Sequence, residues 1–167
     1  MPDEKSENKP CSVEKGKEKG AVRTPRVLFI CTYNSVRSQI AEGYLRARYS
    51  DHFEAMSAGS EALGVHPLAI AVMDEVGIDI SAQRSKLVDE FFHTDIDIVV
   101  KVCDCAHQGC PFFPGARESI NASFPDPSTC DGTPRERIKI FRHVRDAIIT
   151  WIDHSFVPGY GQLRIRP

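Results

Sequence analysis

The chain has 167 residues, with 21 Lys and Arg against 23 Asp and Glu, which gives a formal net charge of −2. This length suits one domain with a sizeable core, and the balanced charge offers no basic field for nucleic acid. No apolar run approaches the roughly 20 residues of a membrane helix, and the N-terminus, rich in Lys and Glu, does not resemble a signal peptide. We therefore expect a cytoplasmic protein that binds neither nucleic acid nor a membrane.

The elements alternate along the chain. We expect residues 1–24 to be a disordered tail, residues 25–157 to be the domain, and residues 158–167 to be a second tail. Apolar runs predict strands over 27–30, 53–57, 97–102 and 119–124, and helical spacing predicts helices from 37, from 67 to a Gly at 77, over 85–92 and from 134 onward. Strands that alternate with helices indicate βαβ units and a parallel sheet, whose ligands bind beyond the carboxyl ends of the strands.

The stretch VLFICTYNSVRSQIAEG ends a predicted strand on Cys31 and starts a helix at Arg37. A loop between a strand and a helix exposes consecutive backbone N–H groups, which favour a tetrahedral oxyanion and the reactive thiolate form of a cysteine. The Arg37 guanidinium would bind two oxygens of the anion. Asn34 suits a left-handed backbone position, the Ser35 hydroxyl could donate to the sulfur, and Ser38 could simply open the helix. The residues expected around the oxyanion are Thr32, Tyr33, Asn34, Ser35, Val36, Arg37 and Ser38.

Asp126 lies between two prolines in FPDPS. The prolines stiffen this segment and could hold the carboxyl group over the oxyanion, as a proton donor for a departing oxygen. Asp-Pro is also common in ordinary turns, so these residues alone leave both interpretations open.

The segment CTYNSVRSQIAEG resembles the signature of the low-molecular-weight protein tyrosine phosphatase superfamily, and the Ser-Gln-x-Ala-Glu-Gly within it resembles the arsenate reductase branch. MSAGSEALGVHPLAIAVMDEVGIDIS extends the resemblance. It implies an α/β fold of the flavodoxin-like three-layer type, with a four-stranded parallel sheet flanked by helices, and it implies that Asp126 is the general acid. Tyr33 departs from the family's usual Gly, and Val36 stands where some members have a further cysteine.

Six cysteines are many for a reducing compartment, where they are more often catalytic, redox-active or metal-binding than structural. Cys103 and Cys110 are seven positions apart, as in thioredoxin-coupled arsenate reductases. The resemblance implies that Cys31 attacks arsenate, that Cys103 then forms a disulfide with Cys31 and releases arsenite, and that Cys110 takes over the disulfide with Cys103. Thioredoxin, or else a glutathione-linked protein, would reduce it. The implied activity is arsenic detoxification without a cofactor or metal, by a monomer that also binds phosphate or sulfate as mimics.

Two other functions remain open. The first is a tyrosine phosphatase that uses Cys31, Arg37 and Asp126, although no aromatic residue follows the Asp-Pro to stack on a substrate ring. The second is a non-enzymatic module that binds zinc or arsenite, with the ligands Cys103, Cys105, His107 and Cys110. That module would leave Cys31, Arg37 and Asp126 without a role.

The resemblance also concerns a monovalent cation. Some relatives bind potassium near the oxyanion loop, and the matching positions here are Asn34, Glu42, Ser57 and Lys86. Because the last position is a lysine, its ammonium could replace the ion and pair with Glu42. We therefore expect activity that does not depend on potassium, unless Lys86 is merely a surface lysine.

Overall fold

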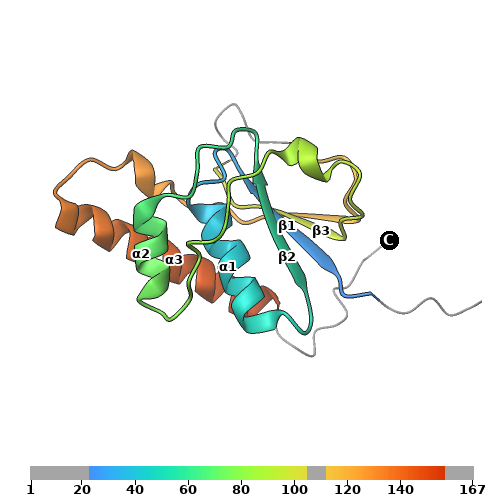
Figure 1. Ribbon diagram of the computed structural model, residues 1–167, viewed down its shortest axis with the longest axis horizontal. Coiled ribbons are helices and arrows are strands. Elements are labelled where there is room, and N and C mark those ends of the chain that lie inside the picture. The colour runs from blue at the N-terminus through green and yellow to red at the C-terminus, as the bar shows by residue number, and fades with distance from the viewer. Residues whose placement is uncertain (1–22, 105–111, 157–167) are drawn as a thin grey trace, which may run out of the picture.

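The computed structural model describes residues 23–104 and 112–156. Its strands are β1 (Arg26–Cys31), β2 (Glu54–Gly59), β3 (Ile98–Lys101) and β4 (Glu118–Asn121). Its α-helices are α1 (Arg37–Tyr49), α2 (Pro67–Asp74) and α3 (Pro134–Ser155), and two short 3₁₀ helices are η1 (Val88–Phe91) and η2 (Pro127–Thr129). The strands form one parallel sheet in the order β2-β1-β3-β4 (Figure 1). The predicted α/β fold with a four-stranded parallel sheet is confirmed.

Strand β1 lies between β2 and β3, and both of its faces are covered by other elements. From Val27 to Cys31 its residues are at most 2% exposed, as a continuous apolar run in a parallel sheet predicts. Cys31 is level with Gly59 of β2, and Ile30 is level with Lys101 of β3. The carboxyl ends of the three strands therefore meet at one edge of the sheet.

The two faces of the sheet are covered differently. The three α-helices lie on one face, where Phe29 of β1 shares a buried cluster with Ile40 of α1 and Phe141 of α3 (Figure 1). On the other face, Leu28 and Ile30 pack against Val88 of η1 and against Phe113. This second layer is made of η1 and its flanking connections, and its inner side buries apolar side chains.

The element boundaries follow local chemistry. Helix α3 begins where predicted, since the Thr133 side chain accepts from the Glu136 amide at 3.3 Å and the Thr133 amide donates to the Glu136 carboxylate at 2.8 Å. Such a capping box contributes about 1 kcal/mol. The predicted helix over 85–92 contracts to η1, because Gly59 pairs with the extended Leu87 in an isolated bridge. Within residues 23–104 and 112–156, no helix is long and apolar enough to cross a membrane.

Candidate active site

The Cys31 loop joins β1 to α1 and is held by buried polar side chains. Asn34 has φ +46°, the left-handed conformation that Asn tolerates best after Gly, and its side chain is fully buried. Gln39 Nε2 donates to both Asn34 oxygens at 3.0 Å, and the Lys86 amide donates to Asn34 Oδ1 at 2.7 Å. The loop conformation is therefore fixed by residues from α1 and from the segment before η1.

A chain of hydrogen bonds leads from Asn34 to the nucleophile. Asn34 Nδ2 donates to Ser38 Oγ at 2.8 Å and to Ser57 Oγ at 2.9 Å, which uses both of its N–H bonds. Ser38 Oγ lies 2.9 Å from Cys31 Sγ, within hydrogen-bond distance, and this hydroxyl would be the donor whenever the sulfur is a thiolate. The sequence had suggested Ser35 for this role, and the structure corrects that assignment to Ser38.

Gly59 shows why β2 ends on a glycine. A Cβ atom there would lie 2.6 Å from the Glu61 carbonyl oxygen, 2.7 Å from that of Thr32 and 2.8 Å from the Asn34 nitrogen. Three backbone contacts this short leave no room for a side chain. Thr32 serves this junction, because its carbonyl accepts from the Glu61 amide at 2.9 Å. Gly59 thus lets β2 approach the oxyanion loop closely.

Arg37 and Asp126 meet beside the thiol. Arg37 NH1 donates to the Phe124 carbonyl at 3.0 Å, and NH2 donates to Asp126 Oδ2 at 2.8 Å. Asp126 Oδ1 accepts from the Ser128 amide at 2.9 Å and from its hydroxyl at 2.6 Å, which orients the carboxyl group. The residues that line one small cavity are Cys31, Tyr33, Ser35, Val36, Arg37, Asp126 and Ser128. The structure therefore brings the expected nucleophile, cation and acid together.

His66 lies in the same region but serves structure. Its Nδ1 accepts from the Leu68 amide at 3.0 Å and caps α2, and its ring packs on Phe141 with centroids 4.9 Å apart. Burial, and then the charge of Arg137, lower the His66 pKa below its usual 6.5. The imidazole is therefore neutral near pH 7, which suits a hydrogen-bond acceptor.

The second thiol, Cys103, is 3% exposed and lies two residues after the end of β3. The Val102 amide donates to the Ile30 carbonyl at 2.9 Å, so this segment runs beside the end of β1. Cys11, Cys105, His107 and Cys110 lie outside the described residues. Within the described part of the chain, no group of three or more His, Cys, Asp or Glu side chains could hold a metal ion.

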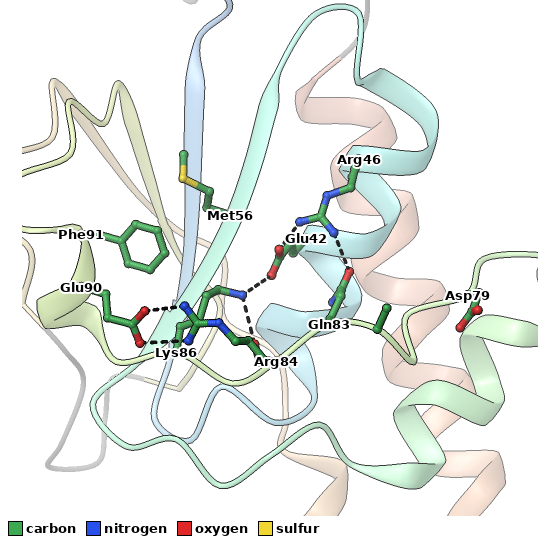
Figure 2. Close-up of a pocket in the computed structure, with 10 residues that line it drawn as sticks. Glu42, Arg46, Met56, Asp79, Gln83, Arg84, Lys86, Glu90 and Phe91 are labelled. Carbon is green, nitrogen blue, oxygen red and sulfur yellow. Dashed lines mark hydrogen bonds and ion pairs between the residues drawn. The ribbon is translucent and has the colours of Figure 1, made fainter.

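Lys86 and Glu42 form the expected ion pair (Figure 2). The Lys86 ammonium donates to Glu42 Oε2 at 3.1 Å and to the Arg84 carbonyl at 3.1 Å. Glu42 also accepts from Arg46 and from the Ser57 hydroxyl, which is the other partner of Asn34. The side chains of Lys86 and Glu42 are 12% and 4% exposed. This mostly buried charge pair contacts the loop through Ser57 and Asn34.

Sequence reasoning missed one supporting contact. Gln83 Nε2 donates to Gln39 Oε1 at 2.7 Å, and Gln39 in turn holds Asn34. Figure 2 shows Gln83 at the wall of a cavity of about 530 Å³ whose lining includes Glu42, Arg46 and Lys86. Two glutamines 44 positions apart give no periodic signal, and only the polar character of the segment before η1 hinted at such a role.

Comparison with known proteins shows which family and which folds this chain resembles. Residues 26–151 match the family described as low molecular weight phosphotyrosine protein phosphatase. The arsenate reductase of Halalkalibacterium halodurans is 43% identical over 122 residues, which cover 73% of this chain and 88% of that protein. A solved arsenate reductase in the phosphate-binding state has a TM-score of 0.66 and 32% identity, over 78% of this chain and 95% of that one. A thioredoxin-dependent arsenate reductase of Corynebacterium glutamicum has a TM-score of 0.53 and 29% identity, over 82% and 66% of the two chains.

Proposed function

Because this chain belongs to the low molecular weight phosphotyrosine protein phosphatase family and resembles arsenate reductases in both sequence and fold, we propose that it reduces arsenate to arsenite. The observation that carries the proposal is the position of Cys103. A phosphatase needs one thiolate, whereas a reductase must also collect two electrons, and thiols supply them by exchange. Here a second, buried thiol follows the strand next to the one that ends on Cys31.

In the first step, the Cys31 thiolate attacks the arsenic of a bound arsenate. The N–H groups of the loop and the Arg37 guanidinium bind the remaining oxygens. A sulfur–arsenic bond forms and an arsenic–oxygen bond breaks, and Asp126 gives its proton so that the oxygen leaves as water. The 2.8 Å ion pair between Arg37 and Asp126 places cation and acid at one cavity with the thiol. Arsenate would have to open this pair, so that Arg37 NH2 binds an arsenate oxygen and the Asp126 carboxyl group can carry the proton that it gives.

In the second step, the Cys103 thiolate attacks the Cys31 sulfur. A disulfide forms, the sulfur–arsenic bond breaks, and its electron pair stays on arsenic, so arsenic(V) becomes arsenic(III) and leaves as arsenite. Cys110 then attacks Cys103, which frees Cys31 and leaves a Cys103–Cys110 disulfide for an external dithiol. We infer that thioredoxin in the cytoplasm is this reductant and that the enzyme is a monomer. The thioredoxin-dependent neighbour supports the choice of reductant.

We further infer that Lys86 supplies the positive charge that a potassium ion supplies in some relatives. Its ammonium is covalently fixed and 3.1 Å from Glu42 Oε2, and Glu42 contacts Ser57 beneath the loop. Binding of potassium would bring a second cation beside this ammonium. Activity should therefore be independent of potassium.

The decisive experiment follows NADPH oxidation by thioredoxin reductase, thioredoxin and the enzyme after arsenate is added. We expect many turnovers in the wild type, one arsenite per molecule in Cys110→Ser, and none in Cys31→Ser. Cys130→Ser is the matched control, because Cys130 is a thiol at the end of η2 outside the proposed relay. Cys105→Ser tests whether that residue resolves the disulfide instead. Steady hydrolysis of an aryl phosphate without arsenate-dependent oxidation would assign the protein to the phosphatases.

A further inference from the structure

Three large apolar side chains are exposed on the layer that covers the second face of the sheet. They are Leu87, Phe92 and Phe112, which are 42%, 49% and 73% exposed, and we call them the η1 patch. Leu87 and Phe92 directly flank η1, and the Phe92 ring lies 6.0 Å from that of Phe113, the neighbour of Phe112. Single exposed apolar residues are ordinary, but three on one layer of the fold, close to a reactive site, indicate an interaction surface.

The η1 patch borders the edge of the sheet that carries the thiols. Leu87 pairs with Gly59, the residue level with Cys31 across the sheet. Phe112 belongs to the connection between β3 and β4, which begins with the segment that carries Cys103. In Figure 1, η1 lies beside the upper ends of β1 and β2, where these strands lead into the loops of the site. A protein seated on the patch would therefore lie at the end of the sheet where Cys31 and Cys103 are placed.

We propose that the η1 patch is the docking surface of the dithiol protein, of the thioredoxin type, that reduces the enzyme's disulfide. This inference rests on the proposed function. One thiolate of the partner attacks the enzyme disulfide and forms a mixed disulfide, and its second thiol closes the partner's own disulfide. Two electrons and two protons pass to the enzyme, and the partner leaves oxidised.

The size of the patch favours this partner over a second copy of the chain. A fully buried aromatic side chain removes about 150–250 Å² from water, so three partly exposed side chains offer on the order of 300 Å². A stable interface needs about 800 Å² on each partner, whereas transient redox encounters are the smallest specific interfaces. A reductant that must leave after each turnover fits a small apolar contact of this kind.

The test compares Phe112→Ser and Phe92→Ser with Phe112→Leu, a matched control that keeps an apolar side chain. Two quantities are measured on the full chain: the KM for thioredoxin in steady state, and the arsenite released in a single turnover without thioredoxin. We expect each serine variant to raise the KM for thioredoxin about tenfold, with the single turnover unchanged and Phe112→Leu close to wild type. If Phe92→Ser fails to fold because the ring contact with Phe113 is lost, the Phe112→Ser variant still tests the proposal.

Three outcomes would overturn the inference. An unchanged KM for thioredoxin in Phe112→Ser would show that the η1 patch does not bind it. A wild-type dimer in sedimentation that the serine variants dissociate, with an unchanged KM, would assign the patch to self-association. A normal single turnover that thioredoxin cannot renew would exclude this class of partner. Failure of the wild-type single turnover itself would instead remove the proposed function, and the η1 patch would lose its role with it.

Discussion

Replacing Lys86 by methionine removes the ammonium but keeps most of the side-chain volume. The substitution leaves the carboxylate of Glu42, which is only 4% exposed, without the ammonium that lies 3.1 Å from it. The Ser57 hydroxyl would still donate to Glu42 and Arg46 would still pair with it, although Arg46 is 49% exposed and partly screened by water.

The size of the effect follows from these contacts. Two unit charges 3.1 Å apart attract by about 5 kcal/mol at an effective dielectric constant of 20. Desolvation of the ammonium offsets part of this, and the remaining Arg46 compensates Glu42 in part, so we expect Lys86→Met to lose about 2 kcal/mol of unfolding free energy. Urea titration measures it, with Lys139→Met on the exposed side of α3 as a control that changes stability by less than about 0.5 kcal/mol.

The proposed role of Lys86 also makes a prediction about the response of the activity to potassium. Wild-type activity should agree within about twofold between KCl and NaCl at equal ionic strength, because the ammonium is already in place. In Lys86→Asp, two carboxylates face each other, and potassium should restore both stability and activity. Strong stimulation of the wild type by potassium, or a Lys86→Met variant as stable as the wild type, would refute this reasoning.

Two further predictions concern Cys31 and the contact between α2 and α3. Ser38→Ala should slow alkylation of Cys31 by iodoacetamide at pH 7 about tenfold, because a hydrogen bond to a thiolate is lost; Ser35→Ala should not, and equal rates in the two variants would contradict the geometry. Hydrogen bonds from Arg142, and then from Arg145, lower the pKa of Glu75 below its usual 4.5. The stability that Glu75 contributes is therefore present above its unfolded pKa and is lost as the pH falls through its lower folded pKa. Below about pH 5, the free energy of unfolding from urea titration should fall more steeply in the wild type than in Glu75→Gln, by less than about 1 kcal/mol. Parallel plots of this free energy against pH for the two proteins would contradict the assignment.

The sequence predicts β1 and β3 well because each is a buried apolar run. It predicts β4 less closely, since Glu118–Asn121 alternates partly buried and exposed residues and ends before the expected 124. The helix predicted over 85–92 is where local pattern misleads. Apolar spacing there is compatible with a helix. However, the Gly59 amide donates to the Lys86 carbonyl at 2.9 Å, and the backbone at Leu87 is extended and forms a β-bridge with Gly59. The local conformation depends on a contact with a strand residue 27 positions earlier. A local sequence pattern is too short to include both partners of this contact.

The residues of the site also differ in how well the sequence predicts them. Cys31 and Arg37 are predictable because one strand, one loop and one helix place them. The two prolines around Asp126 left an ordinary turn open, and its place in the site was expected through the family resemblance. The Lys86–Glu42 pair was expected only through the family resemblance. The hydroxyl that contacts the sulfur was assigned to Ser35, which lies in the loop before α1, whereas the structure places Ser38 of the first turn of α1 against Cys31. The sequence does not show in which direction the Ser38 hydroxyl points. That direction depends on Asn34, whose own conformation is fixed by Gln39 and Lys86.

The contact between Gly59 and the oxyanion loop also ties catalysis to folding. The Glu61 amide donates to the Thr32 carbonyl, and a Cβ at Gly59 would lie 2.8 Å from the Asn34 nitrogen, so the shape of the loop depends on the pairing of β2 with β1. A partly unfolded molecule in which β2 has detached would retain Cys31 on a strand but lose the array of donors around it. An oxyanion that binds only the complete loop would therefore also stabilise the pairing of β2 with β1.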